Sequence, residues 1–204
     1  GDVYKRQLGL IYMYIKAQWV KKQDPGNEKM VSISSAIKKG ALAFLNAEYR
    51  LLLIFVIVAS AALFGISLVV ETTSWLIIPA FVVGAIFSGL AGNIGMRIAT
   101  DANSRTTQAA RTSLPKALNV AFGGGVVMGL GVAGLAGLGL SLFFMFFINQ
   151  FMNDGGDFYT NMTIVLEALA GFSLGAESIA LFARVGGGIY TCLLYTSPSP
   201  RDGL

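Results

Sequence analysis

Four long apolar segments constrain this chain more than any other feature of its sequence. Each approaches or exceeds the ~20 residues that cross the hydrocarbon core of a bilayer as a helix. The segments cover residues 51–70, 75–96, 117–148 and 161–185. Across the whole chain, 54% of the residues are hydrophobic and 13% are charged, which is too apolar for a soluble domain of this size. The sequence therefore predicts an all-α protein, a polytopic bundle of transmembrane helices.

The first part of the chain predicts one incomplete helix and one amphipathic helix. Residues 8–20 are apolar but too short to span a bilayer, so we expect them to be the inner end of a truncated first helix. The Pro-Gly pair at 25–26 predicts a turn. Asn27 is a suitable N-cap for the segment that follows. Apolar residues recur there at helical spacing as far as Arg50, which predicts a helix at the membrane surface that continues into the next span.

Small residues recur at four-residue spacing in two of the predicted spans. One set is Gly84, Ser88 and Gly92; the other is Gly125, Gly129, Ala133, Gly137 and Ser141. Small side chains at this spacing let two helix backbones approach closely within a membrane. We therefore expect both sets to be packing surfaces between helices.

The distribution of basic residues predicts the orientation of the chain. Residues 21–50 contain six Lys or Arg and residues 97–116 contain four, whereas residues 71–74 and 149–160 contain none. By the positive-inside rule, the first two segments are cytoplasmic. The 97–116 segment is expected to be a polar loop.

These cytoplasmic basic residues have two interpretations. Lys38 and Lys39 either attract an anionic substrate or belong to a solvated or lipid-facing surface. Arg105 and Arg111 either contact phosphate or flank the membrane as an ordinary basic loop. Composition and spacing leave both alternatives open.

The last apolar segment contains three charged residues, and Glu167 lies near its outer end. Glu177 and Arg184 are seven residues apart, so on a helix they share one face about 10 Å apart along the axis. An ionisable residue in a spanning helix costs about 2.5–3.5 kcal/mol or more, and therefore usually faces a protein interior and marks an ion path. Alternatively, Arg184 anchors the cytoplasmic end of the helix by snorkelling. The three glycines that follow, Gly186, Gly187 and Gly188, predict a turn that emerges on the cytoplasmic side.

Two stretches of this sequence resemble a known family. ALFARVGGGIYT (180–191) and GNIGMRIATDANSRTTQAA (92–110) are similar to the membrane-bound, ion-translocating pyrophosphatases, and the resemblance extends over residues 8–191. It implies the N-terminal membrane region of a pump of about sixteen spans. Such a pump hydrolyses magnesium pyrophosphate and exports H+ or Na+ across a bacterial or archaeal cell membrane, as a homodimer in the lipid bilayer. It has no nucleic-acid partner.

The resemblance also implies which residues contribute to the site. The arginine that matches Arg184 lies at the ion gate, and the glycines that match Gly186, Gly187 and Gly188 lead to the substrate site. At the position of Glu177 many members of the family carry Ser or another small residue, so this sequence departs from them. Our own hypothesis is that Glu177 lines the exit path, and the alternative is that it pairs with a neighbouring helix. Mg2+ is the implied cofactor and K+ a second candidate. The metal ligands and catalytic residues lie beyond Thr191, so the chain by itself is expected to be inactive.

Two other classes of function remain open. One is a secondary transporter in which Glu177 and Arg184 form a substrate site at the membrane midplane. The other is a small structural membrane subunit whose glycines serve only packing.

The two ends of the chain differ in composition from the segments beside them. Residues 1–7 and 192–204 resemble translated sequencing-adapter sequence. The only cysteine, Cys192, lies in the second of these ends, so it indicates nothing about the redox compartment. We therefore expect the natural sequence to be residues 8–191, and base the predicted fold on these residues alone.

Overall fold

The computed structural model describes residues 2–70, 74–151 and 157–196, and these residues form five helices. The helices are α1 (Asp2–Lys21), α2 (Glu28–Val69), α3 (Ile77–Ala110), α4 (Leu114–Phe151) and α5 (Phe158–Thr196). The described residues include no strand. Helices α2 to α5 are each long and apolar enough to cross a membrane. The prediction of an all-α membrane bundle is confirmed.

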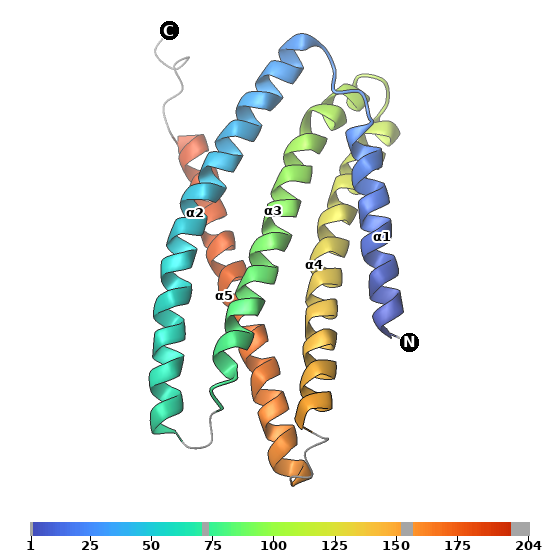
Figure 1. The fold of residues 1–204 in the computed structure, drawn as a ribbon. Coiled ribbons are helices and arrows are strands. Elements are labelled where there is room, and N and C mark those ends of the chain that lie inside the picture. The colour runs from blue at the N-terminus through green and yellow to red at the C-terminus, as the bar shows by residue number, and fades with distance from the viewer. Residues whose placement is uncertain (1, 71–73, 152–156, 197–204) are drawn as a thin grey trace.

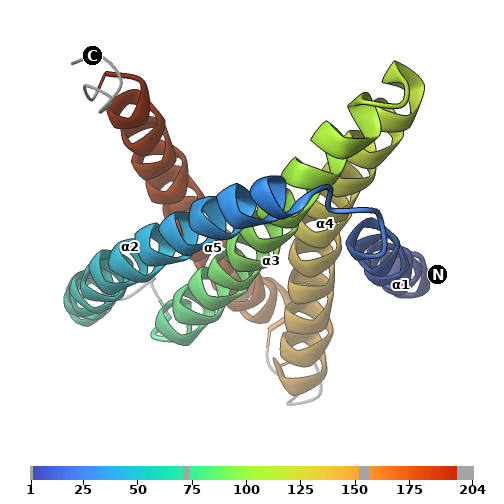
Figure 2. The same cartoon turned by 90° about the horizontal axis from the view of Figure 1, so that it is seen from above.

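The helices are arranged around α3. Helices α1, α4, α3 and α2 lie side by side in that order, and α5 crosses behind α3 (Figure 1). The view from above shows α3 and α4 between α1 and α2 (Figure 2). The end of α1, the start of α2 and the connection from α3 to α4 lie at one end of the bundle, together with the end of α5 (Figure 1). The basic segments predicted to be cytoplasmic therefore lie at the same end.

Helix α2 begins where the sequence predicted and continues without interruption into the span. The Asn27 side chain accepts a hydrogen bond of 2.9 Å from the backbone N–H of Met30, as expected of an N-cap. Gly26, in the turn before it, has a φ of 91°, a conformation that glycine adopts without steric cost. At 1.5 Å per residue, the 42 residues of α2 are about 63 Å long, so the helix extends well beyond a bilayer core.

The predicted polar loop at 97–116 is wrong, because most of it is helical. Helix α3 continues to Ala110, and α4 begins at Leu114. Residues 97–110 contain neither glycine nor proline and include several strong helix formers, so polarity alone does not end the helix. Pro115 occupies the second position of α4, where a missing N–H breaks no helical hydrogen bond.

The predicted glycine turn is also wrong. Gly186, Gly187 and Gly188 lie inside α5, which continues to Thr196. Each glycine costs about 1 kcal/mol relative to alanine in a helix, but in a non-polar environment the helix is the structure that satisfies the backbone hydrogen bonds. Helix α1 begins at Asp2 and α5 ends at Thr196, so both helices include residues of the two ends that the predicted fold excluded. A helical structure does not test whether these ends derive from adapter sequence.

Glycines form the contact between α3 and α5. A Cβ atom at Gly84 would collide with the carbonyl oxygen of Phe172, and one at Gly175 would collide with the carbonyl oxygen of Phe81. The two backbones therefore touch, as expected for small residues in a membrane helix. We call this contact the α3–α5 crossing. The prediction for Gly84 is confirmed, but a Cβ at Gly92 would meet no atom within 4 Å.

The small-residue stripe predicted on α4 does not pack as expected. Gly125 and Gly129 are exposed, and a Cβ at either would meet no atom within 4 Å. Other glycines of α4 are buried instead: Gly123, Gly124, Gly131, Gly134 and Gly139. Because α4 carries glycines on more than one face, periodicity alone did not indicate which face packs within this chain.

Candidate functional site

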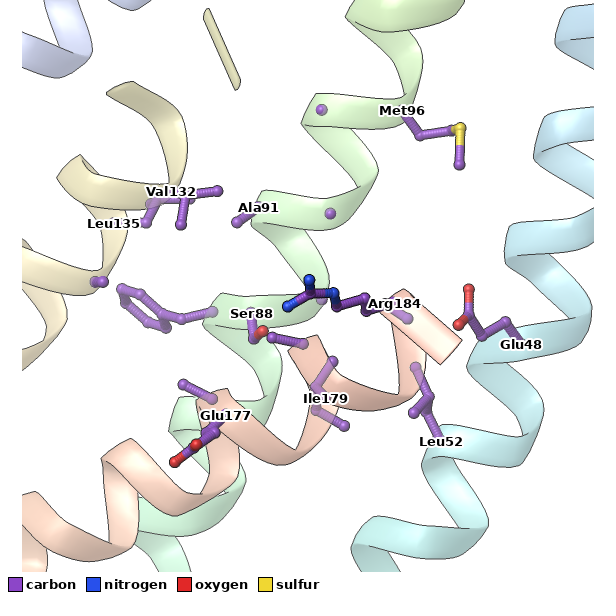
Figure 3. A pocket seen from close by; sticks show the side chains of 18 of the residues that line it. Glu48, Leu52, Ser88, Ala91, Met96, Val132, Leu135, Glu177, Ile179 and Arg184 are labelled. Carbon is purple, nitrogen blue, oxygen red and sulfur yellow. The ribbon is translucent and has the colours of Figure 1, made fainter. Parts of the chain in front are cut away.

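Helices α2, α3, α4 and α5 line a groove of about 780 Å3 (Figure 3). Most of its lining is apolar, and it includes Leu52, Ala91, Val132, Leu135 and Ile179. Leu52 and Ile179 also belong to a small buried cluster with Ala85, which joins α2, α3 and α5. The charged residues of the groove are Glu48, Glu177 and Arg184.

Glu177 and Arg184 both line the groove from α5, in agreement with the predicted common face. The Arg184 guanidinium is directed towards Ser88 of α3, whereas the Glu177 carboxylate is directed away from Arg184 (Figure 3). Both residues are exposed within this chain. Among the described residues, neither makes an ion pair or a hydrogen bond. The two charges therefore share the groove but do not pair with each other.

Glu48 of α2 is a third charged residue of the groove, and the sequence analysis missed it. Its Oε1 atom is buried and has no hydrogen-bond partner among the described residues. The carboxylate is directed from α2 towards α5 (Figure 3). A Cβ at Gly186 would lie 2.8 Å from Oε1, so the carboxylate occupies space that a side chain at this position would fill.

A sequence signal for Glu48 was present in the pattern of α2. Ala41, Leu45 and Leu52 are the buried residues of this helix, and they recur at intervals of four and seven. Glu48 lies three residues after Leu45 and four before Leu52, on the same face. A carboxylate on the apolar face of an amphipathic helix was the feature to notice.

Of the predicted glycines, each has a different place relative to the site. Gly186 is next to Glu48, and Gly187 lines the groove. Gly188 is exposed, and a Cβ there would meet no atom within 4 Å. Of these three glycines, only at Gly186 would a Cβ displace a neighbouring side chain of the described residues, that of Glu48.

Two polar contacts hold α2 against α3 beside the groove. The Tyr49 hydroxyl donates a hydrogen bond of 2.7 Å to the carbonyl oxygen of Gly89. Nearer the start of α2, the Lys38 ammonium lies 2.6 Å from the Asp101 carboxylate. Lys38 therefore has a carboxylate partner in α3, whereas its neighbour Lys39 is exposed.

Arg105 binds backbone carbonyls at the cytoplasmic end of the bundle. Its guanidinium donates hydrogen bonds to the carbonyl oxygens of Lys21, Gln23 and Asp101. These contacts fix the end of α1 against α3 and give Arg105 a structural role. In the same turn, the backbone N–H of Gly26 and the side chain of Gln108 bind the Asp24 carboxylate and lower its pKa.

The described residues do not form a metal site. They contain no group of three or more His, Cys, Asp or Glu side chains that would hold a metal ion. The residues in this part of the chain therefore do not fit the set of ligands that Mg2+ requires.

Comparison with known sequences identifies the family. A profile of the inorganic H+ pyrophosphatase family matches residues 7–193. The chain belongs to this family. The match includes all four long apolar helices up to Leu193, and it confirms the resemblance found in the sequence.

Curated relatives of the family have closely similar sequences. A K(+)-insensitive pyrophosphate-energized proton pump 2 of Moorella thermoacetica is 42% identical over 89% of this chain and 24% of its own length. A proton pump of Pyrobaculum aerophilum, also K(+)-insensitive and pyrophosphate-energized, is 42% identical over 90% of this chain and 24% of its own length. A K(+)-stimulated pyrophosphate-energized sodium pump of Thermotoga maritima is 41% identical over 84% of this chain and 24% of its own length. The chain thus spans about a quarter of the length of the curated relatives it matches.

Proposed function

We propose that this chain is the N-terminal membrane region of a primary ion pump, a multi-pass protein of the cell membrane. In this proposal the whole protein hydrolyses magnesium pyrophosphate and exports H+ or Na+. The family match over residues 7–193 carries the proposal, and the relatives it resembles are named as pyrophosphate-energized pumps. Those names include both proton and sodium pumps, and both K(+)-stimulated and K(+)-insensitive ones, so the ion and the K+ requirement stay open.

The catalytic part of this pump belongs to the sequence beyond Thr191. We place there the magnesium ligands, the residues that hydrolyse pyrophosphate and the contacts of a homodimer. The test is to extend the natural reading frame past Thr191 in the source DNA. Lysine and aspartates directly after Thr191 are expected, whereas mirrored broken helices would indicate a secondary transporter and an early stop codon a small subunit. The family match favours neither of these alternatives.

Arg184 has the role of the ion gate in this proposal. A guanidinium stays charged even in a non-polar groove, so it holds nearby carboxylates ionised and favours release of their cation. Its direction towards Ser88 across the groove supports this role over simple anchoring at the helix end.

The experiment for Arg184 uses the full-length protein in proteoliposomes, with hydrolysis and ion transport measured separately. We expect Arg184→Ala to reduce the ions moved per pyrophosphate at least about tenfold, because the charge that biases release is gone. Arg50→Ala, which removes an exposed basic residue, is the matched control. An unchanged transport-to-hydrolysis ratio in Arg184→Ala would contradict the gate.

Glu177 lies two turns from Arg184 towards the outer side, and we assign it to the exit path. It lines the groove and has no ion pair among the described residues, which supports this assignment over pairing with another helix of this part of the chain. We expect Glu177→Ser to change ion selectivity or coupling in the full-length pump. If both stay as in the wild type, the exit-path role is wrong.

A further inference from the structure

We propose that a polar cleft at the cytoplasmic end of α1, α3 and α4 binds the headgroup of a membrane phospholipid. The headgroup is one that carries a primary amine beside its phosphodiester, as in phosphatidylethanolamine. This inference goes beyond the proposed pump function and does not depend on hydrolysis. It requires only that the chain lies in a membrane with its basic end at the cytoplasmic surface.

The cleft has a volume of about 300 Å3 and lies where the end of α1 meets the connection from α3 to α4 (Figure 1). It is separate from the groove that contains Arg184, and the two share no lining residue. The lining residues used below are Trp19, Asp24, Arg105, Gln108, Lys116 and Asn119. We call it the cytoplasmic cleft.

The depth of the cytoplasmic cleft is the first argument. A Cβ atom at Gly123 of α4 would lie 2.9 Å from the Trp19 ring, so the ring is level with this glycine. Tryptophan is favoured at the membrane–water interface, and the next residue to Gly123, Phe122, is apolar and 69% exposed. Asn119 and Lys116 follow about one and two turns further towards the cytoplasm. The cleft therefore begins where the apolar surface of α4 ends, at the level of the headgroups.

The charges of the cytoplasmic cleft are the second argument. Its basic residues are Arg105 of α3 and Lys116 of α4, and its acidic residue is Asp24, in the turn before α2. None of the three makes an ion pair with another described residue. Basic pockets between membrane helices on the cytoplasmic side are typical sites for phospholipid headgroups. A cleft with both signs of charge complements a headgroup that has a phosphodiester and an ammonium.

Arg105 is already positioned to bind an anion. Its guanidinium donates hydrogen bonds to the backbone carbonyl oxygens of Lys21, Gln23 and Asp101. A guanidinium has five N–H donors, and neutral carbonyls orient it without cancelling its charge. The Lys116 side chain is exposed and flexible, so it can adjust to a phosphodiester that Arg105 attracts.

Asp24 supplies the negative charge for the amine. The backbone N–H of Gly26 donates a hydrogen bond of 2.9 Å to its carboxylate, and the Gln108 side chain donates one of 3.0 Å. These bonds lower the pKa of Asp24, so the carboxylate is ionised at neutral pH. Both donors are neutral and leave the charge uncompensated. A primary ammonium can donate a hydrogen bond to this carboxylate, whereas the quaternary ammonium of a choline headgroup has no N–H.

The main experiment measures lipid binding to the delipidated full-length protein by native mass spectrometry. The probes are phosphatidylethanolamine, phosphatidylglycerol and phosphatidylcholine with the same acyl chains. We expect Lys116→Gln to weaken binding of the ethanolamine lipid about tenfold. Lys39→Gln, which removes an exposed charge outside the cytoplasmic cleft, is the control and should bind as the wild type. Equal affinities of the two variants for the ethanolamine lipid would overturn the proposal.

Asp24→Asn tests the preference for an amine. Asparagine keeps a side-chain oxygen that accepts a hydrogen bond from Gly26, so the turn is expected to persist, but the negative charge is lost. We expect the affinity for the ethanolamine lipid to fall about tenfold while that for the glycerol lipid does not fall. If the ratio of the two affinities is the same in Asp24→Asn and the wild type, the proposed headgroup is wrong.

A free phosphate offers Arg105 and Lys116 the same chemistry as a phosphodiester. The two sources are distinguished by adding inorganic phosphate or pyrophosphate to the protein with the ethanolamine lipid bound. We expect the lipid to stay bound, because the amine and the acyl chains add contacts that a free anion lacks. Release of the lipid by either anion would show that the cytoplasmic cleft is a site for free phosphate.

A crosslinking measurement on the wild-type protein remains informative even if a variant does not fold. It uses vesicles that contain an ethanolamine lipid with a photoreactive group at the glycerol end of one acyl chain. We expect mass spectrometry to find crosslinks within residues 19–24 or 105–123, which surround the cytoplasmic cleft. Crosslinks confined to other residues would contradict the proposal.

Lipid binding and pyrophosphate hydrolysis are separate readouts, so the two proposals fail separately. If the wild-type protein hydrolyses pyrophosphate but Lys116→Gln and Asp24→Asn bind lipids as the wild type does, the cleft proposal is wrong and the pump stands. If the wild-type protein binds the ethanolamine lipid as expected but hydrolyses no pyrophosphate, the pump is wrong and the lipid site stands.

Discussion

The α3–α5 crossing and the groove between α2 and α5 are built in opposite ways, although α5 contributes to both. At the crossing, Gly84 and Gly175 bring two backbones into direct contact and leave no room for a side chain. In the groove, Glu48, Glu177 and Arg184 face about 780 Å3 of space. The crossing is fully packed by residues of the described chain. The groove still contains charged residues without a described partner.

This difference shows which contacts stabilise the bundle and which are available for function. Helices in a membrane gain little from the hydrophobic effect, so close backbone packing supplies much of their association energy. Charges are costly in the same environment and persist where an ion or another charged group compensates them. Ten residues of α3 are buried but only three of α2, so the wall of the groove formed by α2 is the less tightly packed element.

The largest expected effect tests the crossing. Gly175→Ala places a Cβ against the Phe81 carbonyl oxygen, and we expect a loss of about 1–3 kcal/mol in the free energy of unfolding because the backbones must separate. Gly129→Ala is the control, since its Cβ meets no atom within 4 Å and alanine favours the helix by up to about 1 kcal/mol. Denaturant titration of the purified protein in mixed micelles measures both. If the two variants are equally stable, close backbone contact at the crossing does not stabilise the bundle.

A smaller effect is expected where α2 is tied to α3 beside the groove. Tyr49→Phe removes the hydrogen bond to the Gly89 carbonyl oxygen and should lower the free energy of unfolding by about 0.5–1.5 kcal/mol. Tyr159→Phe changes a tyrosine that is 80% exposed and should have little effect. The same titration measures this pair. A loss at Tyr49 as large as that at Gly175 would mean that α2 is held as firmly as the crossing.

The smallest effect is expected at the cytoplasmic end of α2. Lys38→Gln breaks the ion pair with Asp101, but the Lys38 side chain is 39% exposed, so solvent screening limits the loss to about 0.2–1 kcal/mol. The difference from Lys39→Gln, which changes an exposed neighbour, should shrink as the salt concentration rises. A difference that does not depend on salt would mean that Lys38 contributes by packing and not by charge.

The sequence predicted the start of α2 better than the end of α3. Asn27 and the Pro-Gly turn act locally, through a hydrogen bond and a backbone conformation that need no distant contact. The 97–116 segment was predicted as a loop because it is polar. Contacts from distant residues, such as Arg105 with Lys21 and Asp101 with Lys38, stabilise its helical part, and these are not visible in local sequence.

The residues of the candidate site also divide into those found from local sequence and one that depends on a distant contact. Glu177 and Arg184 were found from their own spacing, because two charges seven residues apart in an apolar helix define a face by themselves. Glu48 was missed because its importance depends on Gly186, which lies 138 residues later and meets it only when α2 and α5 pack. The predicted turn at the glycines failed for a related reason, since their cost in a helix is small beside that of unsatisfied backbone groups.

The sequence by itself determined that this chain is a helical membrane protein of the pyrophosphatase family, because apolar length, basic asymmetry and two specific motifs are properties of consecutive residues. Only the tertiary structure decided which glycines touch a neighbouring backbone and which carboxylate packs against Gly186. Both depend on how helices far apart in sequence are rotated against each other. Helical periodicity defines the faces of each helix, and packing alone selects among them.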